Sequence, residues 1–487
     1  MLKCLYPMLK SFLRSVTPEP LISAYHYALA RLAAFWFGHP SERLIVIGVT
    51  GTNGKSTTVQ FIGRLLESAG ERVGWTTTAS FKVADREWVN DKKMTMLGRF
   101  QTQKLLREMV DAGCRYAVIE TSSQGIYQFR HIGINYDLLA FTNLTPEHIE
   151  AHGGFENYKA AKGKLFARLS RLPRKHINDH EIEKSIVVNL DDPHAEYFLS
   201  FEADRYGGVS WRGASVESLA RLNTTPVQVA DVMFEATCTT FSWSGLDFHF
   251  KPIGRFYLEN AIVPIATLAL LGFEHEVIRR GVEQLEPVPG RLEKIEEGQP
   301  FTVIVDYAYE PAALSAVYEA VALIRNHPQP PVRPARTTLS GWPDAGHPGG
   351  LLEKEGGTRG RLIHILGSAG GGRDVARRKV LGEMAAAHDD IVIVTNEDPY
   401  DEDPMQIVND VADATGRAGK MDGVDLYRIL DRQEAIDFAI KIAHDDDLVL
   451  VTGKGSEPVM AVAHGKKIQW DDREAARRAL NKRYGRT

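Results

Sequence analysis

The chain has 487 residues, and at roughly 100–200 residues per domain this length predicts two to four domains. Hydrophobic residues make up 44% and charged residues 25%, which excludes a wholly disordered chain. The net charge of −5 leaves no basic field for nucleic acid, so we expect no nucleic-acid partner. The cysteines, Cys4, Cys114 and Cys238, form no CxxC pair, which argues against a zinc ribbon and for a reducing, cytoplasmic location.

Residues 21–37 (LISAYHYALARLAAFWF) form a strongly apolar stretch near the N-terminus. The stretch is shorter than the roughly 20 apolar residues that span a bilayer, and it contains His26 and Arg31. It lacks a small-residue cleavage site, so it does not resemble a signal peptide. Two interpretations stay open: a helix packed on the body of the protein, or a helix at a membrane surface, which the aromatic residues 35–37 favour.

Apolar, β-branched runs alternate with helical stretches along the chain, which predicts an α/β fold with parallel sheets. Strands are expected at residues 44–49, 116–120, 137–143, 185–190, 301–307, 362–367, 391–396 and 448–453. Helices are expected at 57–70 and 261–272. Short alternating pieces in residues 206–260 indicate a small antiparallel insertion.

The same pattern predicts three regions: a helical segment (1–42), a central domain (43–288) and a C-terminal domain (289–487). The second boundary follows EPVPGR, which has two prolines and a glycine before a new series of strands. Residues 327–360 contain six prolines and seven glycines, so we expect a flexible insertion there.

The strongest local signal is GVTGTNGKS (48–56), which follows an expected strand and opens an expected helix. Glycines allow the backbone N–H groups to face phosphate oxygens, while Lys55 can neutralise phosphate charge and Ser56 can reach Mg²⁺. The strict motif requires glycine at position 49, where the chain has valine. We still favour ATP binding over a chance glycine turn. The nucleotide-binding residues predicted here are Gly51, Thr52, Asn53, Gly54, Lys55, Ser56 and Thr57.

Further motifs give a specific resemblance. The chain contains IETSSQGIYQFRHIGI, FTNLTPEHIEAHG, NYKAAKGKLF, NLDD, GRFYLEN, PVPGRLE, VDYAYEPAAL, GSAGGGRD, EDPYDEDP and VTGKGSE. Together with TGTNGKS, and in this order over residues 43–460, they resemble the Mur ligase family, most closely the branch that adds the third peptide residue. The resemblance implies a central P-loop-type ATPase domain and a C-terminal Rossmann-like domain. It also implies an ATP-dependent amide ligase, which adds an amino acid to the peptide of a muramoyl-type cell-wall precursor through an acyl phosphate.

The resemblance implies four catalytic residues: Lys55, Glu120, His148 and Lys162. It assigns Mg²⁺, at two sites, to Ser56, Glu120, His148 and a carbamylated Lys162. Such cations suit a reaction that brings the negative charges of a carboxylate and ATP together. Taken singly, three of these residues have plainer interpretations. Glu120 could be a charge at a strand end, His148 a residue at the start of a helix, and Lys162 a lysine on a solvated helix face.

The resemblance also implies roles outside the phosphate loop. Asn260, Arg291 and Asp306 match family positions around the nucleotide, and Ser122 and Arg130 match positions that hold the muramoyl-peptide acceptor. The alternative for Arg130 is a surface salt bridge.

Four departures from the family pattern affect the substrates. Only 42 residues precede the ATPase strand, so we expect no UDP-recognising N-terminal domain. Tyr309 and Ser456 stand where the family has histidines, and Tyr400 stands where it has an arginine that clamps a carboxylate.

The resemblance implies an amino-acid pocket of Glu397, Asp398, Tyr400, Gly453 and Glu457. Three carboxylates without the arginine suit a basic side chain such as lysine better than diaminopimelate. The alternative is that these carboxylates are solvated loop charges.

Two other functions stay open. The same chemistry could act on a lipid-linked muropeptide or a polyglutamate-type acceptor, or the chain could be a non-catalytic nucleotide-binding module. The presence of Lys55, Glu120, His148 and Lys162 argues against the second of these.

Overall fold

The computed structural model describes residues 18–92, 94–145, 153–326, 360–372 and 375–485. The chain divides into two compact units, an N-terminal unit (Met1–Glu286) and a C-terminal unit (Pro287–Thr487). Almost all of the expected insertion at 327–360 lies outside the described residues, and the three-region organisation stays a prediction. Among the described residues, no helix has the length and apolar character needed to cross a membrane.

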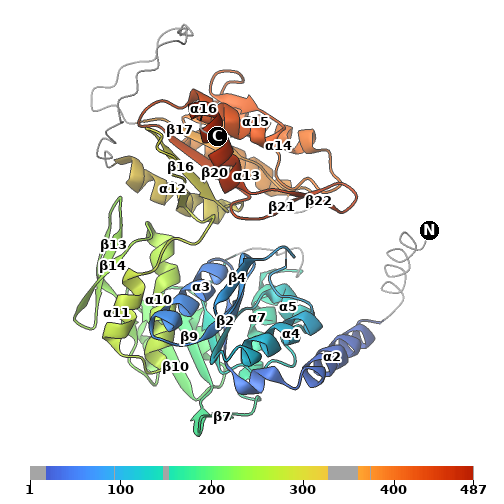
Figure 1. Ribbon diagram of the computed structural model, residues 1–487, viewed down its shortest axis with the longest axis vertical. Coiled ribbons are helices and arrows are strands. Elements are labelled where there is room, and N and C mark those ends of the chain that lie inside the picture. Colours follow the sequence, from blue (N-terminus) through green and yellow to red (C-terminus); the bar gives the residue numbers. More distant parts are fainter. Residues whose placement is uncertain (1–17, 93, 146–152, 327–359, 373–374, 486–487) are drawn as a thin grey trace. The chain divides into compact units, whose positions relative to one another are not determined.

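A nine-stranded sheet organises the N-terminal unit (Figure 1). Its strands, in sheet order, are β11 (Val227–Gln228), β10 (Arg205–Ser210), β9 (Ser185–Asn189), β6 (Leu138–Phe141), β1 (Ile45–Thr50), β5 (Tyr116–Glu120), β2 (Val73–Thr76), β3 (Ser80–Val83) and β4 (Arg86–Val89). The first seven run parallel, and β3 and β4 add an antiparallel edge. The central strands are buried along their whole length because helices cover both faces.

The helices of this unit are α2 (Glu19–Trp36), the short η1 (Pro40–Arg43), α3 (Lys55–Ser68), α4 (Arg99–Asp111), α5 (Ser123–Tyr127), α7 (Phe155–Leu169), α8 (Ala195–Leu199), α9 (Val216–Ala220), α10 (Arg255–Leu270) and α11 (His275–Glu283). Apolar residues of α4, α7 and α8 form one core with Val46, Leu139 and Ile186. Helices α3 and α10 pack together against the strands from the opposite side (Figure 1).

The expected antiparallel insertion is smaller than residues 206–260. Within this range, β12 (Ala230–Phe234), β13 (Thr239–Trp243) and β14 (Leu246–Phe250) form a separate antiparallel sheet. Outside it, β7 (Lys175–Ile177) pairs with β8 (His180–Ile182) as a hairpin. Residues 205–210 instead extend the main sheet, because they pair in parallel with β9.

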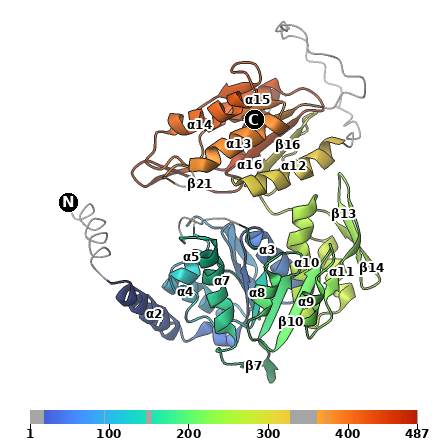
Figure 2. The same ribbon diagram turned by 180° about the vertical axis from the view of Figure 1, so that it is seen from behind.

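A six-stranded sheet organises the C-terminal unit. Its strands, in sheet order, are β15 (Glu293–Lys294), β16 (Thr302–Asp306), β20 (Leu448–Thr452), β17 (Leu362–Leu366), β18 (Ile391–Val394) and β19 (Leu426–Arg428). Its helices are α12 (Pro311–Asn326), α13 (Val375–His388), α14 (Pro404–Arg417), α15 (Arg432–Ile442) and α16 (Asp472–Tyr484), and β21 (Val459–Val462) pairs with β22 (Lys466–Gln469). All strands of the sheet except β15 run parallel. Helices α15 and α16 share one core with the sheet, and α13 packs on α14, seen from behind in Figure 2. The predicted α/β class with parallel sheets is confirmed.

Candidate active site

The turn between β1 and α3 has the shape of a phosphate-binding loop. Gly54 lies at φ 77°, in the left-handed region, and a Cβ there would meet the Asn260 side-chain oxygen at 1.8 Å. Only glycine fits this contact, which brings Asn260 of α10 against the loop. All the predicted residues of the loop, Gly51, Thr52, Asn53, Gly54, Lys55, Ser56 and Thr57, lie between the end of β1 and the first turn of α3.

Charged and polar side chains of the loop are held by its surroundings. Lys55 Nζ donates to the Thr52 carbonyl oxygen at 2.6 Å, and the Asn53 backbone N–H donates to Asn143 Oδ1 at 2.8 Å. The loop therefore places a lysine at the N-terminus of a 14-residue helix, the end of a helix that favours anions. This arrangement suits a polyphosphate.

Glu120 lies at the end of β5, beside β1 in the parallel register. Its carboxylate is buried and accepts hydrogen bonds from Ser56 Oγ at 2.7 Å and from the Thr78 backbone N–H at 2.7 Å. The Thr78 hydroxyl donates to it as well, at 3.2 Å. Thr78 is a residue that the sequence motifs did not indicate, because it belongs to a turn far from them in the chain.

These oxygen atoms fit a magnesium ion. Mg²⁺ prefers carboxylate and hydroxyl oxygens together with phosphate, and Ser56 and Glu120 offer both protein ligand types in contact with each other. Among the residues that the structure describes, no three His, Cys, Asp or Glu side chains gather as a metal cluster. His148, the third predicted ligand, lies outside the described residues.

Lys162 is buried beneath the phosphate loop rather than solvated on a helix face. It projects from α7, and its Nζ donates to the Gly51 carbonyl oxygen at 2.6 Å. The same Nζ lies 4.5 Å from the centre of the Tyr158 ring, and the Tyr158 hydroxyl is 3.2 Å from Thr52 Oγ1. Lys55, Ser56, Glu120 and Lys162 therefore all contact this loop or its first helical turn.

The predicted acceptor residues flank the short helix α5. Ser122 caps it by accepting a hydrogen bond from the Gly125 N–H at 3.1 Å. Arg130 follows it and donates to Gln128 Oε1 at 2.6 Å and to the Met96 carbonyl oxygen. Arg99, which the motifs did not indicate, donates to the Gln128 carbonyl oxygen.

Arg99 and Arg130 form a site of unbalanced positive charge. Burial lowers the pKa of both guanidinium groups, and the charge of Arg130 lowers that of Arg99 further. Both donate to neutral oxygens only, among the residues described by the structure. Two such groups together suit an anionic ligand.

In the C-terminal unit, Arg291 and Asp306 lie close together. The Arg291 guanidinium lies 4.2 Å from the centre of the Tyr307 ring. Asp306 ends β16, and its carboxylate accepts hydrogen bonds from the N–H groups of Leu292 and Ala308 at 2.7 and 2.6 Å. Burial raises the pKa of Asp306, and the charge of Arg291 opposes this effect.

The carboxylates of the predicted amino-acid pocket are largely paired within the protein. The fully buried Lys454 lies 3.0 Å from Asp398 and also contacts Glu457. Asp398 also accepts from the Ala461 N–H at 2.6 Å, and Tyr307 donates to Glu457 at 2.9 Å. Two of the three carboxylates thus share the single positive charge of Lys454, a residue whose role the sequence analysis did not anticipate.

Glu397 differs from its neighbours. It is 4% exposed, and its Oε2 atom lacks a hydrogen-bond partner among the described residues. This oxygen packs on Gly453, where a Cβ would meet it at 2.8 Å. Burial raises the pKa of Glu397, against the charges of Lys454, Arg377 and Arg432.

Arg377 and Ser368 each have a buried polar atom comparable to Oε2 of Glu397. Arg377 Nε and Ser368 Oγ lack hydrogen-bond partners in the described part of the chain, although another Arg377 nitrogen pairs with Glu310. Ser368 follows β17 and Gly453 follows β20, the two strands where the order of the sheet reverses. Open α/β sheets bind ligands in the crevice at such a point.

Tyr400 lies at the edge of this region. Its backbone is left-handed, with φ 52°, and its ring lies beside Gly371 of the glycine-rich segment 367–372.

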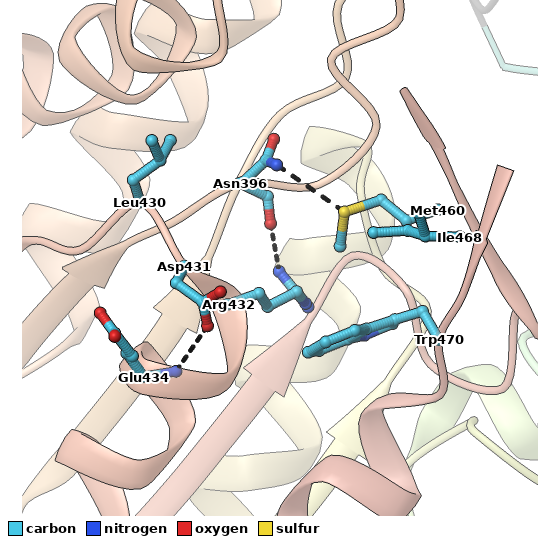
Figure 3. A pocket seen from close by; sticks show the side chains of 8 residues that line it. All are labelled: Asn396, Leu430, Asp431, Arg432, Glu434, Met460, Ile468 and Trp470. Carbon is cyan, nitrogen blue, oxygen red and sulfur yellow. Dashed lines mark hydrogen bonds between the residues drawn. The ribbon is translucent and has the colours of Figure 1, made fainter. Parts of the chain in front are cut away.

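A pocket of about 420 Å³ lies beside Asn396, the residue before Glu397 (Figure 3). Its apolar walls are Leu430, Met460, Ile468 and Trp470, and the rest of the lining is Asn396, Asp431, Arg432 and Glu434. Arg432 is the only cation of this lining, and it forms two hydrogen bonds of 2.7 Å with Asp472. Asp431 caps α15 through the Glu434 N–H. The pocket therefore has no uncommitted cation for a substrate carboxylate.

Family models match part of each of the two units. Residues 49–268 match the Mur ligase middle domain, and residues 351–455 match the Mur ligase, glutamate ligase domain. A UDP-N-acetylmuramyl-tripeptide synthetase of Roseiflexus sp. (strain RS-1) is 35% identical over 469 residues, which cover 93% of this chain and 82% of that protein. The chain belongs to the Mur ligase family. This Mur ligase is an ATP-dependent ligase that uses Mg²⁺, and the resemblance drawn from its motifs is confirmed.

Other relatives of this Mur ligase support the same assignment. The UDP-N-acetylmuramoyl-L-alanyl-D-glutamate–2,6-diaminopimelate ligase of Geobacillus kaustophilus (strain HTA426) is 32% identical, covering 96% of this chain and 85% of that protein. A solved structure of a ligase with that name has a TM-score of 0.54 and 26% identity, covering 91% of this chain and 79% of its own. Folylpolyglutamate synthase of Mycobacterium tuberculosis, with a TM-score of 0.60, 15% identity and 95% and 96% coverage, shares the fold.

Proposed function

We propose that this Mur ligase adds an amino acid to the peptide of a muramoyl-type precursor in peptidoglycan synthesis. ATP phosphorylates the acceptor carboxylate, releasing ADP, and the amine of the amino acid then displaces phosphate from the acyl phosphate. The observation that carries the proposal is the convergence of Lys55, Ser56, Glu120 and Lys162 on one phosphate loop. Asn260, Arg291 and Asp306 are proposed to contact the nucleotide.

Magnesium and a carbamylated Lys162 complete this proposal. Ser56, Glu120 and His148 would hold the cations, which neutralise charge between ATP and the acceptor carboxylate. Carbon dioxide would add to the neutral Lys162 amine with loss of a proton, giving an anionic ligand in place of a cation. Support comes from the burial of Lys162 against the Gly51 carbonyl.

Chemical rescue tests this modification. Lys162→Ala should lose ligation and regain part of it when a small carboxylate such as acetate is added. The matched control is Lys164→Ala, two residues along the same helix, where the lysine is exposed. An unmodified lysine mass in a bicarbonate-loaded, Mg²⁺-bound sample, with no rescue, would reject the carbamate.

We propose that Ser122 and Arg130, joined by Arg99, hold the anionic acceptor. Arg99→Gln should raise KM for the acceptor about tenfold, as expected for a hydrogen bond to a charged group. The KM for ATP should stay unchanged, and an equal rise in both constants would contradict the assignment.

We propose that the amino acid binds at the carboxyl ends of β17, β18 and β20, with Glu397 facing its amine and Arg377 its carboxylate. The support is the pair of buried, unpartnered atoms at Glu397 and Arg377. Asp398, Tyr400, Gly453 and Glu457 would shape the site, with Lys454 balancing its charge. Because the neighbouring pocket lacks an uncommitted cation, we expect L-lysine to be preferred over meso-diaminopimelate.

One experiment tests the function as a whole. Phosphate release is measured with ATP, a panel of amino acids and either UDP-linked or lipid-linked acceptors. Release that requires both an acceptor and L-lysine supports the proposal. A strong preference for meso-diaminopimelate would instead indicate that Arg377 binds the second carboxylate of that substrate. No phosphate release with any combination would favour a non-catalytic nucleotide-binding module.

We also propose a cytoplasmic location, because the reaction consumes ATP, with a peripheral membrane contact through residues 21–37.

A further inference from the structure

Helix α2 presents an apolar stripe to solvent. Leu21, Tyr25, Ala28, Leu32 and Phe35 follow one another at intervals of four, three, four and three residues, so they share one face. Phe35 is 71% exposed, and Trp36, which adjoins the stripe, is 73% exposed. Contiguous patches of exposed large apolar side chains commonly mark a surface that binds a protein or a membrane.

The opposite face of α2 is fixed to the N-terminal unit. Ala30, Ala33 and Ala34 are buried, and α2 packs on α4 at the edge of the unit (Figures 1 and 2). The contact is close, because a Cβ at Gly133 would meet the Ala30 carbonyl oxygen and the Ala34 methyl group at 2.9 Å. The stripe is therefore the outer face of an anchored helix.

Basic side chains lie near the stripe. Arg31 lies on α2, burial and the charge of Arg31 lower the pKa of Arg168, and Arg99 begins α4, the helix on which α2 packs. Within the described parts of the chain, none of these three arginines forms an ion pair with a carboxylate. Residues 1–36 contain four Lys or Arg and one Glu, although the whole chain carries a net charge of −5.

We propose that this face of α2, defined by Leu21, Tyr25, Leu32, Phe35 and Trp36, docks on the surface of an anionic lipid bilayer. Aromatic and leucine side chains enter the headgroup boundary while basic groups bind lipid phosphates, the usual chemistry of an interfacial helix. A second copy of the chain is a poorer occupant, because a twofold contact through this stripe would bring its unpaired arginines together.

Docking here has a consequence for the acceptor, which rests on the proposed function. Arg99 begins α4, the helix on which α2 packs, and the charge of Arg130 in the acceptor site lowers the pKa of Arg99 beyond the effect of burial. Gln128 holds both arginines. The acceptor site thus adjoins the docking face, and the enzyme receives a muramoyl peptide that is anchored to the bilayer by a lipid.

Vesicle co-sedimentation of the full chain tests the docking. Vesicles of phosphatidylcholine and phosphatidylglycerol, in a three-to-one ratio, are compared with phosphatidylcholine alone. The wild type should bind the anionic vesicles at least about tenfold more tightly, with weaker binding as salt rises. The triple variant Leu32→Ser, Phe35→Ser, Trp36→Ser should lose at least about tenfold in affinity, since each change removes large apolar area from the contact.

Matched variants control for nonspecific adhesion. Met233→Ser, Met421→Ser and Val424→Ser remove comparably exposed apolar groups elsewhere and should leave binding unchanged. Arg31→Gln should weaken binding to anionic vesicles about fivefold, the share of one basic group near the surface. Equal binding by wild type and the triple variant, or equal binding to both lipid compositions, would overturn the proposal. So would a concentration-dependent dimer that the triple variant abolishes.

Ligation assays separate this inference from the proposed function. The triple variant should keep phosphate release with a water-soluble muramoyl-peptide acceptor and lose it, at least about tenfold, with a lipid-linked acceptor in vesicles. Equal release by wild type and variant with the lipid-linked acceptor would overturn the acceptor assignment while leaving the docking result intact. Absence of ligation with any acceptor would reject the proposed function, and the vesicle result would still decide the docking.

Discussion

At the scale of single residues, a cation and a carboxylate of the proposed phosphate site are each held by neighbouring residues. Lys55 is anchored to its own loop, and Glu120 receives Ser56 and two Thr78 donors, so both keep fixed positions before substrates bind. Such preorganised groups stabilise developing charge without rearranging in the reaction.

Lys55→Ala and Glu120→Gln should each lower the rate of ATP-dependent phosphate release by about 10²–10³-fold. The first change removes the proposed contact to phosphate, and the second removes the proposed negative ligand for Mg²⁺. Thermal unfolding should show both variants folded, and the exposed Lys104→Ala should keep wild-type activity. Full activity in either variant would contradict the assigned roles.

The buried His131 should make the stability of the protein depend on pH. It is 5% exposed, and burial, with the charges of Arg168 and Lys164, lowers its pKa to about 3 from an unfolded value near 6.5. Between these values the unfolded chain binds a proton that the folded chain does not, so stability falls as pH falls. Between pH 6.5 and pH 5, His131 should lower the free energy of unfolding by about 2 kcal/mol.

Urea unfolding at pH 7, 6 and 5 measures this effect. His131→Gln, which has no group that titrates in this range, should show a shallower loss of unfolding free energy on acidification. Identical pH profiles for the wild type and the variant would show that His131 is not responsible.

At the scale of elements, the β1–loop–α3 unit depends on one close approach. Gly54 combines a left-handed backbone with a contact to Asn260 that leaves no space for a side chain. Gly70, at the end of α3, is also left-handed at φ 87°, but no atom lies within 4 Å of its Cβ position. Substitutions at these two glycines therefore distinguish the effect of backbone strain from the effect of crowding by Asn260.

Gly54→Ala should abolish nucleotide binding, because the new methyl group displaces either the loop or Asn260. Gly70→Ala should keep nucleotide affinity and lower the free energy of unfolding by about 1 kcal/mol, the usual range for left-handed strain. Calorimetric titration with a non-hydrolysable ATP analogue measures the first effect, and urea unfolding measures the second. Unchanged affinity in Gly54→Ala would disprove the close approach.

At the scale of the whole molecule, the two units have separate sheets and separate cores. Units that bury separate cores commonly unfold as separate cooperative transitions. We therefore expect two calorimetric transitions. The effects of a ligand and of mutations show which transition belongs to which unit.

A non-hydrolysable ATP analogue at about 100 times its Kd should stabilise the unit that contains the phosphate loop by about 2.7 kcal/mol. Asp472→Ala should instead lower the other transition by about 3–5 kcal/mol, because it leaves Arg432 buried without its partner. Lys55→Ala serves as the control and should remove most of the nucleotide effect. A single transition that responds to both changes would contradict independent units.

The fold class, the family and the strand–loop–helix unit around residues 48–56 were predictable from the sequence alone. Each of these depends on neighbouring residues: the eight expected strands are short runs dominated by apolar residues, and the loop is a nine-residue motif between a strand and a helix. The apolar character of residues 21–37 was equally plain. The extent of the antiparallel insertion was overestimated, because alternation alone does not tell which sheet a strand joins.

The surroundings of the candidate functional side chains became known from the three-dimensional structure. It placed Lys162 under Gly51, 111 residues away, and paired Lys454 with Asp398, 56 residues away. It also separated the buried alanines of α2 from its exposed aromatic stripe. A residue's charge balance and exposure are set by contacts between segments distant in the chain, whereas periodicity and motifs record only what is adjacent along it.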